Sequence, residues 1–152
     1  MLTLKKQSLL DTKKLAHHLA GFLAIGDLLL LYGDLGSGKT TFTRELVQAL
    51  GADKNIIVNS PTFTILQQYS GHGLPFPIYH FDAYRLENIG AADQGFEDYI
   101  ASDGLTLIEW PQFMADILPN EYLKIEFAYD KDARDIMISA SGEHYRKLLE
   151  KL

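Results

Sequence analysis

Residues 33–40 read GDLGSGKT, from Gly33 to Thr40, and fit the pattern G-x-x-x-x-G-K-[ST] of a P-loop. In such a loop the glycines let the backbone curl, so that successive N–H groups point at phosphate oxygens. A lysine at the position of Lys39 contacts the β- and γ-phosphates of a nucleotide, and a hydroxyl at the position of Thr40 coordinates Mg²⁺. The loop therefore predicts a protein that binds a nucleoside triphosphate together with Mg²⁺.

The segments on either side of this loop have the character that a P-loop requires. Leu28 to Leu31 form an uninterrupted apolar run, which is typical of a parallel strand covered on both faces. After the loop, apolar residues such as Phe42 and Leu46 recur at helical spacing and predict a helix over about 39–50, with Gly51 just past its end. The order strand, loop, helix distinguishes a phosphate-binding loop from a glycine turn without a ligand.

The remaining pattern predicts one α/β domain over residues 1–152, a P-loop NTPase with a mainly parallel central sheet flanked by helices and an antiparallel C-terminal hairpin. We expect helices over 12–23, with Asp11 as the N-cap, and over 143–152, where Tyr145 and Leu148 face inward. Short helical turns are expected around 96–101. The expected strands are 2–8, 56–58, 64–69, 76–82 and 105–108, with the hairpin 121–129 and 134–140 joined by a polar turn at 130–132.

Composition excludes several classes of function. The 152 residues are 47% hydrophobic and 22% charged, which is ordinary for a soluble globular protein. The chain has no cysteine, so disulfides, thiolate metal sites and a cysteine nucleophile are excluded. Acidic residues outnumber basic ones by 20 to 14, and no run of lysine and arginine exceeds a pair, which disfavours unaided binding of nucleic acid.

Nothing in the sequence predicts a membrane segment. The first residues, MLTLKKQSLL, lack the apolar core and cleavage site of a signal peptide. The most apolar stretch, Phe22 to Tyr32, is short and contains Asp27, so it is not expected to span a bilayer. We therefore expect a cytoplasmic protein with no membrane partner.

Two acids follow predicted strands and are candidates to complete the nucleotide site. Asp82 ends the strand 76–82, and Glu109 follows the strand 105–108. Because ligands of open α/β sheets lie beyond the carboxyl ends of the strands, both carboxylates are expected near the phosphates. Glu109 is the better candidate for the acid on the metal side, and either acid can orient the attacking water.

Other polar residues near these acids have open roles. Thr62, in the loop Ser60-Pro61-Thr62-Phe63, can offer its hydroxyl to Mg²⁺ or belong to a simple turn. His80, Arg85 and Trp110 can each have a functional role or only a structural one. An arginine finger can come from Arg85 or from a partner protein.

Five segments together resemble one family. In chain order they are GDLGSGKTTF from 33, NSPTF from 59, HFDAYRL from 80, GFEDY from 95 and LIEWPQ from 107. Their order and spacing resemble the bacterial tRNA threonylcarbamoyladenosine biosynthesis family TsaE, also called the YjeE family. The resemblance extends from the helix expected at 12–23 to the hairpin ending near 140.

The resemblance implies an ATPase that requires Mg²⁺ and acts with two partner proteins, TsaB and TsaD. Together they attach a threonylcarbamoyl group to the adenosine next to the anticodon, and ATP hydrolysis resets the complex between turnovers. The tRNA is therefore contacted indirectly, through the complex. The implied catalytic residues are Lys39, Asp82 and Glu109, the implied metal ligands are Thr40 and Glu109, and the implied nucleotide-binding residues are Thr12, Gly36, Ser37, Gly38, Lys39, Thr40, Thr41, Asp82 and Arg134. Glu97 matches a family acid of unassigned role.

Two other functions remain open, whereas a GTPase is disfavoured because the sequence contains neither N/T-K-x-D nor D-x-x-G. A small-molecule kinase shares the P-loop, although the chain has only four arginines for a lid, namely Arg44, Arg85, Arg134 and Arg146. A nucleotide-gated protein-binding switch with negligible hydrolysis is the second alternative. Dependence of hydrolysis on partners, and phosphorylation of an acceptor, would separate the three.

Overall fold

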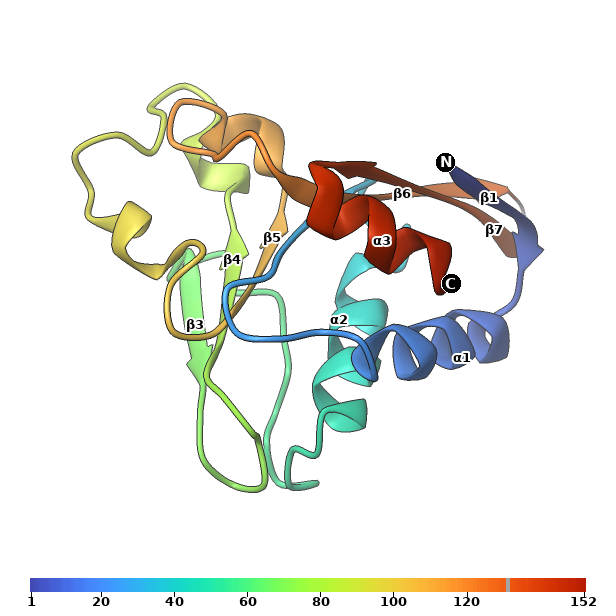
Figure 1. Cartoon of the computed structure of the whole chain (residues 1–152). Coiled ribbons are helices and arrows are strands. Elements are labelled where there is room, and N and C mark those ends of the chain that lie inside the picture. Colours follow the sequence, from blue (N-terminus) through green and yellow to red (C-terminus); the bar gives the residue numbers. More distant parts are fainter. Residues whose placement is uncertain (131) are drawn as a thin grey trace.

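The structure, a computed structural model, describes residues 1–130 and 132–152; Lys131, in the predicted polar turn, lies outside the described residues. Within them seven strands form one sheet in the order β1-β7-β6-β2-β5-β4-β3 (Figure 1). The strands are β1 (Leu2–Gln7), β2 (Leu28–Tyr32), β3 (Leu66–Tyr69), β4 (Ile78–Asp82), β5 (Leu105–Glu109), β6 (Tyr122–Asp130) and β7 (Ala133–Ser141). The helices are α1 (Leu9–Ala20), α2 (Lys39–Ala49) and α3 (Glu143–Glu150), with 3₁₀ turns η1 (Tyr84–Leu86), η2 (Phe96–Tyr99) and η3 (Pro111–Met114).

The sheet is mixed rather than mainly parallel. Its four central strands, β6, β2, β5 and β4, run parallel to one another. The predicted hairpin is confirmed as β6 and β7, and β1 and β3 add further antiparallel pairs at the two edges. The apolar run of β2 therefore lies in the middle of the parallel part, where both of its faces are covered.

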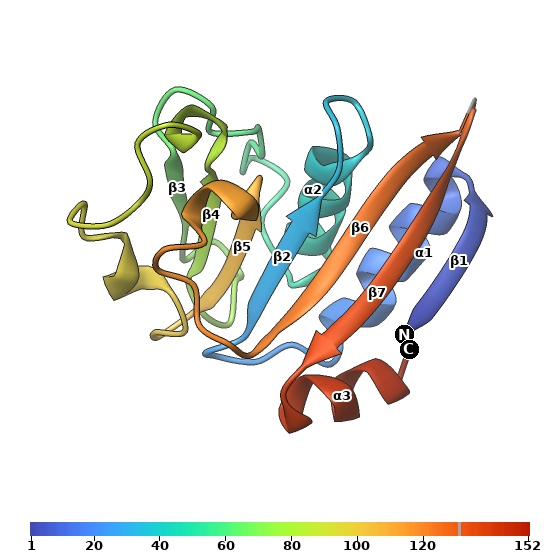
Figure 2. The ribbon, with the colours of Figure 1, turned by 90° about the horizontal axis from the view of Figure 1, so that it is seen from above.

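The side chains of β2 alternate between two apolar clusters. Leu29 and Leu31 pack with α1, α2 and α3 on one face, whereas Leu28 and Leu30 pack against the segments that contain η1, η2 and η3 on the other. Figure 2 shows α1 and α2 lying along one face of the sheet, with α3 beside the end of β7. The helices therefore flank one face only, and short turns with their loops cover the other.

Two local predictions are wrong, and two strands start later than predicted. Helix α1 begins at Leu9 because Ser8, not Asp11, is its N-cap; Asp11 lies one turn into the helix and completes a capping box with Ser8. Residues 56–58 form no strand. Instead, Ile56 and Val58 pack against the apolar cluster on the face of the sheet that the helices cover. Strands β3 and β4 each begin two residues later than predicted, at Leu66 and Ile78.

Candidate functional site

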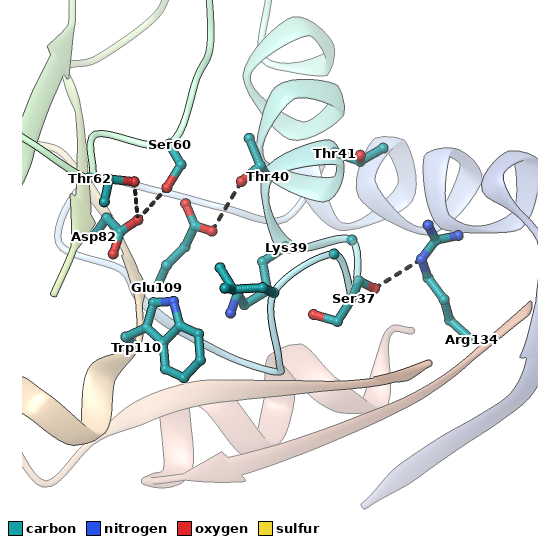
Figure 3. Close-up of a pocket in the computed structure, with 13 residues that line it drawn as sticks. Ser37, Lys39, Thr40, Thr41, Ser60, Thr62, Asp82, Glu109, Trp110 and Arg134 are labelled. Carbon is teal, nitrogen blue, oxygen red and sulfur yellow. Dashed lines mark hydrogen bonds between the residues drawn. The ribbon is translucent and has the colours of Figure 1, made fainter. Parts of the chain in front are cut away.

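A cleft of about 220 Å³ opens at the carboxyl end of the parallel strands. Strand β2 leads into the glycine-rich loop there, and α2 starts at Lys39 with its N-terminus toward the cleft (Figure 3). In the strand register Leu31 is opposite Glu109, and Glu109 is opposite Asp82, so both predicted acids reach this edge. The lining residues are Leu35, Gly36, Ser37, Gly38, Lys39, Thr40, Thr41, Ser60, Thr62, Asp82, Glu109, Trp110 and Arg134.

The loop requires glycine at its first position. Gly33 has φ +151°, and a Cβ there would meet the Ser37 hydroxyl and lie 2.8 Å from the Phe127 carbonyl oxygen. The fold thus packs this turn directly onto β6. Inside the loop, the Ser37 Oγ is buried and has no hydrogen-bond partner within the described part of the chain. A buried polar atom without a partner is uncommon, and here it lies in a loop whose sequence fits the pattern of phosphate-binding loops.

Lys39 is buried at the base of the cleft. Its ammonium group donates to the carbonyl of Gly33 and lies 3.9 Å from the ring centroid of Trp110. Burial lowers the pKa of Lys39, while the nearby carboxylates of Glu109, Asp82 and Asp34 oppose that shift. A cation in this position is ready to contact an anionic ligand that enters the loop.

Thr40 and Glu109 form the oxygen-rich side of the cleft. The Thr40 hydroxyl donates to Glu109 Oε1 over 3.1 Å, and Figure 3 shows the two side chains pointing toward one another. Glu109 Oε2 lies 2.6 Å from Nε2 of the buried His80. Hydroxyl and carboxylate oxygens are the ligands that Mg²⁺ prefers.

Asp82 is bound by the loop that follows α2. Its Oδ2 accepts hydrogen bonds from the hydroxyls of Ser60 and, over 3.2 Å, Thr62. Its Oδ1 accepts from the backbone N–H of Tyr84 over 3.0 Å. Three donors therefore hold Asp82, and Figure 3 shows it at the opposite side of the cleft from Arg134.

The remaining predicted residues divide into two groups. Arg134 and Thr41 line the cleft, and Arg134 Nε donates to the Ser37 carbonyl over 2.9 Å. Thr12 is buried in the first turn of α1, where its hydroxyl donates to the Ser8 carbonyl over 3.0 Å, and it does not line the cleft. Every other predicted nucleotide, metal or catalytic residue lies at the cleft.

Of the residues left open, Thr62 and Trp110 line the cleft and His80 contacts Glu109. Arg85 instead lies over the Phe63 ring, 4.4 Å from its centroid, and exposed Glu97 belongs to η2. Ser60 and Leu35 line the cleft without having been predicted individually. The position of Ser60, two residues before Thr62 in the segment Ser60-Pro61-Thr62-Phe63, was the signal from which it could have been predicted. Leu35 occupies a variable position of the P-loop pattern, so the pattern gives no signal for it.

The residues present fit a magnesium ion held jointly with phosphate rather than in a cage of protein ligands. Among residues 1–130 and 132–152, no group of three or more histidines, cysteines or acids is arranged to hold a metal. Mg²⁺ is commonly held by one or two protein oxygens together with the phosphates of its substrate. Thr40 and Glu109 supply that number beside the loop.

Comparison with known proteins decides the family. The family model described as threonylcarbamoyl adenosine biosynthesis protein TsaE matches residues 6–136. The chain belongs to the TsaE family. Similar proteins that carry the same TsaE name include one from Bacillus subtilis, 42% identical over 93% of this chain and 87% of the relative, and one from Haemophilus influenzae, 40% identical over 74% and 70%.

A solved structure has the same fold. The crystal structure of Bacillus subtilis YdiB superposes with a TM-score of 0.79 at 35% identity, and the match covers 99% of this chain and 92% of that one. The predicted family is thereby confirmed, and so is the α/β architecture. In the described residues, no helix combines the length and the apolarity needed to cross a bilayer.

Proposed function

We propose that this chain is a Mg²⁺-dependent ATPase, a single P-loop NTPase domain over residues 1–152, that acts with TsaB and TsaD. In this proposal, ATP hydrolysis supports threonylcarbamoyl transfer to the adenosine next to the anticodon in tRNA. Relatives named tRNA threonylcarbamoyladenosine biosynthesis protein TsaE support the pathway. The proposal includes a cytoplasmic location, where tRNA is modified.

One observation carries the nucleotide part of the proposal. The glycine-rich loop, a buried lysine, the N-terminus of α2 and a Thr40–Glu109 pair converge on a cleft at the carboxyl end of parallel strands. A helix N-terminus favours phosphate because its free N–H groups and dipole are positive there. The cleft volume of about 220 Å³ is below the range of roughly 300–1,000 Å³ for whole-ligand pockets. It suits the phosphates rather than the whole nucleotide.

The residues take distinct roles in the proposed reaction. Thr40 and Glu109 would hold Mg²⁺, which when bound neutralises charge across the β- and γ-phosphates. Lys39 exchanges the Gly33 carbonyl for phosphate oxygens and stabilises the charge of the transition state. Asp82, which three donors hold beside Glu109, orients the attacking water.

In this proposal, exposed apolar side chains beside the cleft contact the partner proteins. Leu35, which lines the cleft, is 78% exposed, and Phe63, next to the cleft-lining Thr62, is 81% exposed. Tyr84, 42% exposed, lies with its ring against the cleft-lining Trp110. The excess of acidic residues, 20 against 14 basic ones, agrees with tRNA being held by the partners.

Reconstituted tRNA modification tests the proposal. TsaB, TsaD and unmodified tRNA are combined with ATP and the threonylcarbamoyl donor, and the modified adenosine is quantified per TsaD. We expect repeated turnovers with the wild-type chain and no more than about one without it, because resetting requires ATP hydrolysis. Lys39→Ala is expected to behave like omission of the chain, since it removes the buried cation that faces the phosphates.

The matched control is Lys54→Ala, which removes an exposed lysine away from the cleft. Equal amounts of modified adenosine with Lys39→Ala and with wild type would contradict the proposal. Release of ADP without free phosphate would instead indicate that the phosphoryl group goes to an acceptor, as in the kinase alternative.

A further inference from the structure

A buried chain of polar side chains leads from the outer strand of the sheet to the metal side of the cleft. Tyr69 on β3 and His80 on β4 are both buried, and the Tyr69 hydroxyl lies 3.2 Å from His80 Nδ1. On its other side, His80 Nε2 lies 2.6 Å from Glu109 Oε2. Glu109 Oε1 in turn accepts from Thr40. Four side chains are thus linked in series.

The hydrogen positions in this chain follow from what each group can donate. A carboxylate that holds a metal is ionised and can only accept, so His80 Nε2 carries the hydrogen that binds Glu109. In the neutral imidazole, His80 Nδ1 then accepts from Tyr69. Burial raises the pKa of Tyr69 to about 12, with a further contribution from Glu109, so that this hydroxyl keeps the hydrogen it donates. All four side chains have compatible partners.

We propose that His80 is a positioning residue, which holds one oxygen of Glu109 so that the other faces Thr40 and Mg²⁺, with Tyr69 fixing the tautomer of the imidazole. This inference rests on the proposed binding of Mg²⁺-nucleotide. Without the Nε2–H donor, a buried carboxylate loses its partner and its rotamer is no longer fixed. Outer partners of metal ligands change metal affinity or activity by about 10–100-fold in other proteins.

Two substitutions of similar size separate positioning from packing. In His80→Gln the side-chain amide nitrogen reaches about as far as imidazole Nε2, so it can still donate to Glu109. In His80→Asn the amide reaches only as far as Nδ1, so it can bind Tyr69 but not Glu109. Both variants keep a polar, uncharged group in the same buried position.

The measurement is the affinity for a non-hydrolysable ATP analogue, obtained by calorimetry with EDTA and with Mg²⁺. We expect all variants to bind the analogue equally in EDTA, since the loop and Lys39 are unchanged. The gain in affinity on adding Mg²⁺ is expected to fall about 10-fold or more in His80→Asn and to return largely in His80→Gln. Tyr69→Phe is expected to lose part of the gain.

Several outcomes would overturn the inference. One is equal Mg²⁺-dependent gains in wild type and His80→Asn; another is a loss in His80→Gln as large as in His80→Asn. If His80→Asn does not fold, Tyr69→Phe decides, and a wild-type gain in that variant would overturn the proposed chain. Failure of the proposed function looks different, because wild type itself would then show no Mg²⁺-dependent binding.

Discussion

Replacing Gly33 by alanine tests how tightly the glycine-rich loop packs onto the sheet. The residue has φ +151°, and the added Cβ would lie 2.8 Å from the Phe127 carbonyl oxygen. That oxygen belongs to β6, where Phe127 pairs with Ile136, so it has little freedom to move. The Ser37 hydroxyl, which the Cβ also meets, can rotate away.

The expected cost has two parts. A sparsely populated backbone conformation such as that of Gly33 costs an L-residue about 1–3 kcal/mol, and overpacking against a fixed group costs about 1–3 kcal/mol. Gly33→Ala is therefore expected to lower the free energy of unfolding by about 2–6 kcal/mol. Gly71→Ala is the control, because Gly71 has φ +68° with no neighbour within 4 Å of an added Cβ. Only the backbone part, about 1–2 kcal/mol, is expected there.

Urea unfolding of wild type and both variants measures the two costs. The difference between Gly33→Ala and Gly71→Ala measures the contact with β6 together with the additional backbone cost at the φ of Gly33. Equal losses of stability in the two variants would refute the close packing of the loop that the structure shows, whatever the nucleotide affinity of the variants.

Three further predictions test other contacts. In the wild type, the buried N–H of Leu28 donates to the Tyr145 hydroxyl over 2.9 Å. Tyr145→Phe removes this partner, so we expect the free energy of unfolding in urea to fall by about 1–3 kcal/mol. An unchanged free energy of unfolding would contradict that bond. The hydrogen bonds from the Ser8 backbone and side chain hold the pKa of Asp11 below its ordinary value of 3.8. Asp11 therefore stabilises the fold above about pH 4, and this stabilisation is lost as the pH falls further. The difference in free energy of unfolding between wild type and Asp11→Asn should shrink on acidification. A constant difference would contradict the capping interaction. Thr40→Val keeps the volume but not the hydroxyl. Because even an outer partner of a metal ligand changes activity by about 10–100-fold, Thr40→Val should lower Mg²⁺-dependent ATP hydrolysis by at least about 10-fold, whereas Thr40→Ser should retain most of it. Equal rates in the two variants would exclude a role for the hydroxyl.

The centre of the fold could be predicted because its signals are local. Eight residues specify the loop, and the apolar run before it has the length and composition of a buried parallel strand. Asp82 and Glu109 were predicted near each other because parallel strands end at the same edge, and the register pairs them directly. The chemistry of the site thus follows from strand ends and one motif.

The start of α1 could not be predicted with the same certainty. Ser8 and Asp11 are both good N-cap residues. The helical spacing of the apolar residues does not show whether the helix begins after Ser8 or after Asp11. The structure uses both, with Ser8 as the cap and Asp11 as its reciprocal partner. Similarly, Ile56 and Val58 alternate like a strand but find no neighbouring strand to pair with.

Contacts made by irregular loops were also beyond the sequence pattern. Ser60 and Thr62 contact Asp82 from an irregular turn, and no periodicity in the sequence predicts such a turn. Ile65, shortly after this turn, has the uncommon φ of +69°. The buried link from His80 to Glu109 needed the register of β4 against β5. The nucleotide contact of Thr12 is implied only by family resemblance and stays a prediction. In the structure the Thr12 hydroxyl donates to the carbonyl of Ser8, the N-cap of α1.

Phosphate release from ATP by the purified chain is the most direct test of the proposed activity. It is measured with Mg²⁺ and with EDTA, alone and with TsaB and TsaD, for wild type, Lys39→Ala and the exposed-lysine control Lys54→Ala. We predict Mg²⁺-dependent release that rises with the partners, survives in Lys54→Ala and falls by about 100-fold or more in Lys39→Ala. Equal release from wild type and Lys39→Ala would mean that the glycine-rich loop is not the site of hydrolysis.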